Sequence, residues 1–354
     1  MYMKNLFTIL LLLLSSLSIY GQASSDKLIR QGVSLHDKGR YTEAIACYEE
    51  ALKINPSSMS AVYEMSLSYL ELKDYDNAIK NSSKVITANF QPLLMDAYIV
   101  KSSALAEMNK IDQSIQLLND ALIRCGDEYL LYFNLGLCYF NKKDNKQAIF
   151  NLRKAIEIDA TRSSAFLLYA YALNDTGRWL QSFYSFHFFL LLEPNTQRSK
   201  DAFGEMMDII KANIPAGDER LASEEGIDRS KLYEHIVKSR ANIPDTDSYA
   251  YFHEASKQVF FLVSQMQNDT QSGLMWDFFV PTYEEILGSG HFDTYCRYVS
   301  VAYYPESLEW WDKNKEEVDN FIEWFEYGQG TSTEDGEEDL GDDADTEDLE
   351  DNVL

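Results

Sequence analysis

Apolar residues follow a helical spacing through much of the chain, in stretches that alternate with short polar turns. Such spacing predicts amphipathic helices, each burying one face. A small residue recurs before every second stretch, at intervals of 34, 36, 34 and 34 residues. These residues are Ala44, Ala78, Ser114, Ala148 and Ser182. A period of this length is typical of stacked helix–turn–helix pairs.

Other columns of the same register support this interpretation. If Ala44 is position 20 of a 34-residue unit, position 8 is small in all five units and position 11 is large and apolar. The small column is Gly32, Ser66, Ser102, Gly136 and Ala170. The large column is Leu35, Tyr69, Leu105, Tyr139 and Leu173. Small residues at positions 8 and 20 let the two helices of a unit approach closely, and larger residues at positions 4, 11 and 24 fill the space between them.

The stretches 41–56 (YTEAIACYEEALKINP) and 132–139 (YFNLGLCY) resemble the two halves of a tetratricopeptide repeat. The resemblance covers residues 25–194 and implies an all-α solenoid of about five helix–turn–helix repeats. Two extra residues precede the third unit near Pro92, where we expect a longer loop. Solenoids of this kind usually bind other proteins.

The resemblance also implies which residues line the concave groove, namely positions 2, 5, 9 and 12 of each first helix. The candidate partner-binding residues are Tyr63, Leu67, Leu70, Leu130, Phe133, Leu137, Phe140, Leu167, Tyr171 and Asn174. The groove is therefore expected to be apolar and aromatic. Family members that bind acidic chaperone tails carry lysine, asparagine and arginine there, whereas this chain has Ile29, Val33, Tyr63 and Leu67. We do not expect that activity.

Because large exposed apolar patches are rare in soluble monomers, an apolar groove needs a cover. One alternative is a segment of another protein, docked as an amphipathic helix or extended peptide. The other is residues 214–328 of this chain, folded back over the groove. The sequence leaves both open, and it also permits a dimer.

The N-terminus predicts export. Lys4 precedes a leucine-rich apolar stretch over residues 6–17, and Gly21-Gln22-Ala23 offers a small–any–small cleavage site. This is the pattern of a secretory signal peptide over residues 1–23, with an apolar stretch short for a membrane span. The mature chain is expected to be periplasmic or secreted, without inserting into a membrane after cleavage.

The repeat register ends at Pro194. Residues 195–213 predict a capping helix, whose apolar side carries Phe203, Met206, Met207, Ile209 and Ile210. Residues 214–328 predict a helical C-terminal region. Within it, Pro281 marks a kink or break, and Glu306 to Tyr327 carry apolar residues at helical spacing.

Residues 329–354 hold twelve acidic residues and no lysine or arginine, so we expect a disordered tail. The tail supplies about half of the formal net charge of −26. A chain this acidic is not expected to bind nucleic acid or anionic lipid. No calcium-loop spacing accompanies the acidic residues.

No arrangement of residues predicts catalysis, a cofactor or a metal site. The chain lacks a G-x-S-x-G elbow, a phosphate-binding glycine loop and an H-E-x-x-H motif. Its four cysteines lack zinc-site spacing, and its five histidines are isolated in the sequence. His253 adjoins Glu254, but neighbours on a helix point about 100° apart, so the pair is not expected to share a site.

Together these features predict a non-enzymatic protein–protein interaction scaffold or assembly adaptor of the cell envelope. The alternative is an envelope hydrolase or glycan-binding protein with its site in the C-terminal helical region. There, Trp310, Trp311, Tyr303 and Tyr304 are candidates to stack on sugar rings, or else to form core.

Overall fold

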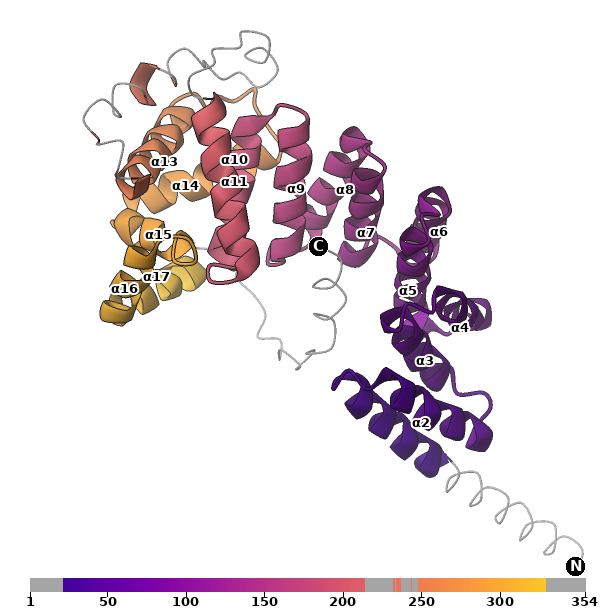
Figure 1. Cartoon of the computed structure of the whole chain (residues 1–354). Helices are drawn as coiled ribbons and strands as arrows, with labels where there is room; N and C mark the ends of the chain where they lie inside the picture. The colour runs from indigo at the N-terminus through magenta and orange to yellow at the C-terminus, as the bar shows by residue number, and fades with distance from the viewer. Residues whose placement is uncertain (1–21, 214–231, 233, 237–242, 244–247, 329–354) are drawn as a thin grey trace, which may run out of the picture. The chain divides into compact units, whose positions relative to one another are not determined.

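The computed structural model describes residues 22–213, 232, 234–236, 243 and 248–328. The expected signal sequence, apart from its last two residues, and the expected disordered acidic tail lie outside these residues. The chain divides into two compact units at residue 158, and Figure 1 shows the helices of each.

The first unit is a run of helix hairpins. Its helices, beginning with one over residues 22–36, are followed by α2 (Tyr41–Ile54), α3 (Met59–Glu71), α4 (Tyr75–Ala88), η1 (Gln91–Leu93), α5 (Leu94–Glu107), α6 (Ile111–Cys125), α7 (Tyr129–Asn141) and α8 (Asn145–Ile158). Each helix packs on the next from α2 to α8, and first helices also pack on one another, α3 on α5 and α5 on α7. This pairwise stacking is a helical solenoid. The expected longer loop is the 3₁₀ turn η1, with Pro92 in its first turn.

The second unit contains the fifth helix pair and the C-terminal helices. It comprises α9 (Ser163–Asp175), α10 (Trp179–Leu192), α11 (Gln197–Asn213), α13 (Ser248–Ser264), η3 (Leu274–Phe279), α14 (Val280–Gly288), α15 (Phe292–Val299), α16 (Pro305–Lys313) and α17 (Lys315–Gly328). The described residues of both units contain helices and no strand, as the sequence predicts for an all-α fold.

The repeat columns meet as the register requires. A Cβ added to Gly32 would lie 2.3 Å from Cε1 of Tyr48, and one added to Gly136 would lie 2.6 Å from Cγ of Leu152. Tyr48 and Leu152 both stand at position 24. Position 8 is therefore small because the second helix of the same pair passes directly over it.

A left-handed backbone residue ends the first helix of every pair. Position 15 has positive φ in all five units, at Gly39 (69°), Lys73 (59°), Asn109 (58°), Lys143 (63°) and Gly177 (76°). The N–H of the following residue donates to the carbonyl of position 11, as from Asp74 to Tyr69 (2.9 Å) and from Asp144 to Tyr139 (2.9 Å). This is a Schellman closure, and it fixes the same tight turn in each hairpin.

One detail of the C-terminal helices differs from the sequence expectation. The helical stretch over 306–327 is two helices, because Asn314 leaves the helical conformation (φ −125°, ψ 41°) and its carbonyl accepts from the N–H of Val318 in the next helix. Pro281 does mark a change within its helical stretch. The π-helical turn η3 ends at Phe279, and Pro281 lies in the first turn of α14, where a missing N–H is tolerated.

Candidate functional site

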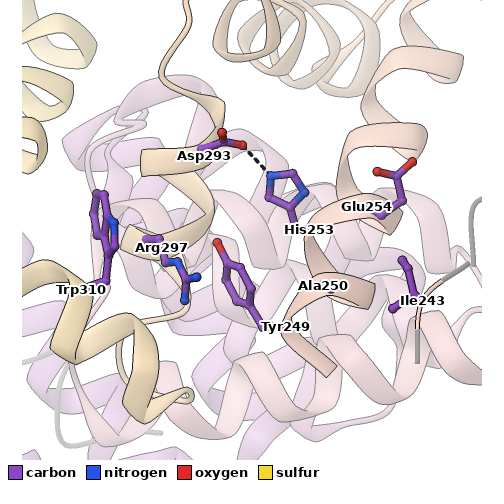
Figure 2. Close-up of a pocket in the computed structure, with 8 residues that line it drawn as sticks. All are labelled: Ile243, Tyr249, Ala250, His253, Glu254, Asp293, Arg297 and Trp310. Carbon is purple, nitrogen blue, oxygen red and sulfur yellow. Dashed lines mark hydrogen bonds and ion pairs between the residues drawn. The ribbon is translucent and has the colours of Figure 1, made fainter. Parts of the chain in front are cut away.

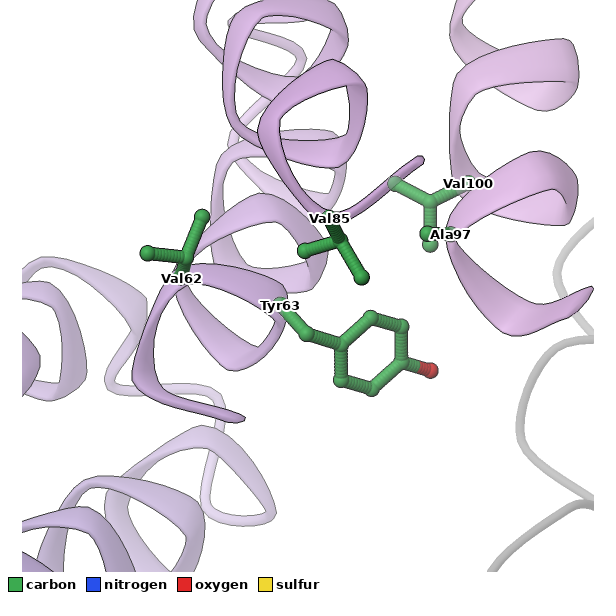
Figure 3. Close-up of a cluster of buried hydrophobic side chains, with 5 residues drawn as sticks. All are labelled: Val62, Tyr63, Val85, Ala97 and Val100. Carbon is green, nitrogen blue, oxygen red and sulfur yellow. The ribbon is translucent and has the colours of Figure 1, made fainter. Parts of the chain in front are cut away.

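The first candidate groove residues form part of a packed cluster between α3, α4 and α5. Tyr63 is buried together with Val62, Val85, Ala97 and Val100, as Figure 3 shows. Leu67 and Leu70 pack against this cluster and remain partly exposed. Tyr63 therefore supports the hairpin stack, and the two leucines present apolar surface beside it.

The α7 residues divide in a similar way. Leu130, Phe133 and Leu137 are buried, and the ring of Phe133 stacks on that of Tyr129 with centroids 5.9 Å apart. Phe140, at the end of the same row, is partly exposed, with Nζ of Lys143 5.0 Å from its ring centroid. Phe140 is thus the aromatic residue of this row that a partner can reach.

In the second unit, Leu167 is buried, and Tyr171 and Asn174 are partly buried. The ring of Tyr171 meets that of Phe186 edge to face, with centroids 5.4 Å apart. Burial, with added repulsion from Glu205 and Asp201 of α11, raises the pKa of Tyr171 to about 12. The hydroxyl of Tyr171 therefore stays protonated near neutral pH.

Asp96, which was not among the predicted contact residues, stands at position 2 of the third unit and is partly buried on α5. Burial raises the pKa of its carboxyl group. The Asp96 charge in turn contributes to the raised pKa of Tyr63, after the larger effect of burial. The row along the first helices therefore combines apolar residues with polar ones, and its acidic members are Asp26 and Asp96, both at position 2. The register alone could have identified them.

The C-terminal helices pack on α10, the second helix of the fifth pair. Twelve of its fourteen residues are buried. Its Phe188 contacts Phe278 of η3 (ring centroids 4.8 Å apart) and Phe325 of α17 (6.5 Å). An α10 that is apolar on nearly every side is explained by this second layer of helices.

His187 lies at the centre of this aromatic core and is fully buried. Its Nδ1 is 2.5 Å from the hydroxyl of Tyr295, and its Nε2 is 3.3 Å from Oγ of Ser256. Burial lowers the pKa of the imidazole to about 3. His187 is therefore a neutral core residue.

The four C-terminal aromatics do not form one platform. Tyr304 is buried, Tyr303 packs on Phe203 (centroids 4.8 Å apart), and Trp311 stacks on Tyr298 (5.0 Å). Trp310 instead lines a pocket of about 540 Å³.

This pocket lies between α13, α15 and α16, and Figure 2 shows its lining. The lining residues are Ile243, Tyr249, Ala250, His253, Glu254, Asp293, Arg297 and Trp310. Nε2 of His253 lies 2.7 Å from Oδ1 of Asp293, and the Arg297 guanidinium lies 3.7 Å from the ring centroid of Tyr249. His253 and Glu254 both line this pocket, although neighbouring residues on a helix point about 100° apart.

No group of three or more histidine, cysteine, aspartate or glutamate side chains is placed to hold a metal ion in the part of the chain that the structure describes. The four cysteines carry free thiols. Within the same residues, every helix is too short or too polar to cross a bilayer.

Comparison with known proteins finds repeats within the first, second and fourth units of the register. A family described as TPR repeat matches residues 32–72, and the tetratricopeptide repeat family matches residues 60–92 and 129–162. BBSome complex member BBS4 of Mus musculus and of Bos taurus are both 26% identical over 120 residues, 33% of this chain. The match spans 22% of the length of each of these relatives.

Solved structures with a similar arrangement include the thermophilic TPR protein TTC0263 of Thermus thermophilus, with 22% identity and a TM-score of 0.45 over 53% of this chain and 100% of that one. PilF of Pseudomonas aeruginosa has 17% identity and a TM-score of 0.47 over 66% of this chain and 96% of that one. The family matches coincide with the helix hairpins and their repeated close contacts. Residues 32–92 and 129–162 of the chain are tetratricopeptide repeats.

Proposed function

We propose that this protein is a non-enzymatic interaction scaffold that binds a segment of a protein partner along the first helices of its repeats. The observation that carries the proposal is the row of apolar residues in one register, whose partly exposed members in the first unit include Ile29, Val33, Leu67, Leu70 and Phe140. Buried Tyr63, Leu130, Phe133 and Leu137 hold that row in place.

The same residues define the chemistry of the partner. Apolar side chains one helical turn apart suit an amphipathic helix or an extended peptide that inserts aliphatic or aromatic anchors. The row lacks the cationic clamp that an acidic peptide needs, and Asp96 adds a negative charge beside it. The proposed partner segment is therefore apolar on its docking face and neutral or basic beside it.

We propose that this binding takes place in the cell envelope or outside the cell. The support is the N-terminal pattern of a positive charge, a leucine-rich stretch and a small–any–small site.

The proposed contact residues are not confined to the first unit. In the second unit they are Leu167, Tyr171 and Asn174.

A photo-crosslinking amino acid tests the binding face directly. Placed at position 140 in α7, it should capture a partner in the cells that encode the protein. Placed at position 150 in α8, it serves as the matched control, because Phe150 is 47% exposed but lies on the second helix of the same hairpin. Equal capture from both positions, or capture only from position 150, would contradict the proposal.

A further inference from the structure

The pocket between α13, α15 and α16 has the dimensions and lining of a binding site separate from the repeats. Its volume of about 540 Å³ lies in the range of small-molecule pockets. Two helical faces form most of it, Tyr249, His253 and Glu254 on α13 and Asp293 and Arg297 on α15. Sites built on helices hold their side chains in fixed relative positions.

Arg297 is held in place and still has donors to offer. Its guanidinium stacks over Tyr249, and its Nη1 lies 3.4 Å from Oγ of Ser307. Among the described residues it has no carboxylate partner within ion-pair distance. A guanidinium has five N–H donors, so most of those of Arg297 remain for a ligand.

Two carboxylates supply acceptors, Asp293 on the same helix as Arg297 and Glu254 on α13. Oδ1 of Asp293 lies 2.7 Å from Nε2 of His253, and the Asp293 side chain is 90% exposed. Oε1 of Glu254 accepts from Gln258 (2.9 Å), which leaves its second oxygen for a ligand. The lining therefore offers both donors and acceptors on planar groups, which is what paired hydroxyl groups require, since each hydroxyl donates and accepts.

Trp310 supplies an apolar surface beside these polar groups. Its indole is partly exposed and makes no ring contact within the described part of the chain, unlike the neighbouring Trp311, which stacks on Tyr298. An aromatic face of this kind packs against the C–H face of a sugar ring.

Charge decides between ligand classes. The pocket holds two carboxylates and one guanidinium, so its lining gives no net attraction to an anion, and the chain carries a net charge of −26. A cation would be opposed by Arg297. We propose that this pocket binds a neutral carbohydrate, with a sugar ring on Trp310 and its hydroxyl groups bonded to Arg297, Asp293 and Glu254.

The full mature chain should be applied to an array of hexose, N-acetylhexosamine and uronic-acid oligosaccharides, and the strongest neutral binder titrated by calorimetry. Trp310→Ala should weaken binding at least about tenfold, since it removes the stacking surface. Trp311→Ala, one residue away and outside the pocket, is the matched control and should bind like the wild type. Arg297→Gln, which keeps a polar side chain, should also weaken binding and serves if Trp310→Ala does not fold.

Three results would overturn the proposal. They are an array on which no sugar binds the wild type, binding confined to uronic acids, and neutral-sugar affinity that survives both Trp310→Ala and Arg297→Gln. Because none of these residues lies on the repeats of the first unit, the outcome is independent of the proposed scaffold function.

Discussion

Gly136 illustrates how the absence of one Cβ atom lets the two helices of a repeat pack closely. Its position on α7 faces Leu152 of α8, and an added Cβ would lie 2.6 Å from Leu152 Cγ and 2.7 Å from Cδ2. Cγ is not the free end of a flexible chain, so the helix pair itself must move. Overpacking of this kind costs about 1–3 kcal/mol, which exceeds the roughly 1 kcal/mol gained in helix propensity when glycine becomes alanine.

Gly136→Ala should therefore lower the free energy of unfolding by about 1 kcal/mol. Chemical denaturation followed by circular dichroism measures the change. Gly288→Ala is the control, because a Cβ at this helical glycine meets nothing within 4 Å. If Gly136→Ala were as stable as the wild type, the close approach of the two helices would be wrong.

His187 predicts a pH dependence of the second unit. Its imidazole is buried and neutral, with a pKa of about 3, against roughly 6.5 in an unfolded chain. Between these values the unfolded state binds one more proton, so stability falls as the pH is lowered through this window, by up to about 1.4 kcal/mol per pH unit. Above the upper value His187 contributes no pH dependence.

The variant His187→Gln isolates this effect, since glutamine can still accept from the Tyr295 hydroxyl and does not titrate. Unfolding of both proteins should be followed from pH 7 to pH 4. As the pH is lowered, the free energy of unfolding of the wild type should fall faster than that of His187→Gln. The difference in slope should reach up to about 1.4 kcal/mol per pH unit, the value for one bound proton. Parallel curves would show that His187 is not held neutral in the fold.

At the scale of elements, all five hairpins have a left-handed residue at position 15. In two of them this residue is a lysine, whose side chain makes the left-handed conformation unfavourable. Lys73 has φ 59° and is exposed, and among the described residues its side chain forms no hydrogen bond or ion pair. Lys73→Gly should raise the free energy of unfolding by about 0.5–1 kcal/mol, because relief of left-handed strain exceeds the extra entropy of glycine in the unfolded chain.

The same substitution within a helix should act in the opposite direction. Lys80 is exposed on α4, and Lys80→Gly should lower stability by about 1 kcal/mol. Comparing the two denaturation midpoints tests the turn geometry. A Lys73→Gly protein destabilised as much as Lys80→Gly would contradict it.

The helices of the repeats could be predicted from the sequence because each hairpin repeats the same pattern of small and large residues. Position 8 is small in all five units and position 24 is large in four of them, and the structure brings the two positions together at Gly136 and Leu152. The polar turns were predicted, but their shared left-handed conformation was not. Gly39, Asn109 and Gly177 favour positive φ, whereas Lys73 and Lys143 at the same position give no such signal. The break at Asn314 was missed because apolar spacing continues across it.

The pocket could not be predicted because its walls lie far apart in the chain. His253 and Asp293 are 40 residues apart, and only the packing of α13 near α15 brings them within 2.7 Å. Asp293 and Arg297 are four residues apart, and this spacing alone predicts that they share one face of a helix. It does not predict that α13 completes a pocket over that face.

At the scale of the whole molecule, export predicts a processed N-terminus. Cleavage after Ala23 would leave Ser24 as the first residue of the mature protein. Mass spectrometry of the protein purified from the cells that encode it should find peptides beginning at Ser24 and none from residues 1–23. A chain that retains Met1 or Tyr2 at its N-terminus would contradict export by cleavage.

The central claim is that the repeats bind a protein segment through the apolar residues of their first helices, among them Phe140 of α7. The most direct test is the dissociation constant of the captured partner segment for wild type, Phe140→Ala and Phe150→Ala. Phe140→Ala should bind at least about tenfold more weakly, because an aromatic anchor at an interface contributes more than about 1.4 kcal/mol. Phe150→Ala, on the second helix of the same hairpin, should match the wild type. Equal affinities for all three proteins would contradict the account.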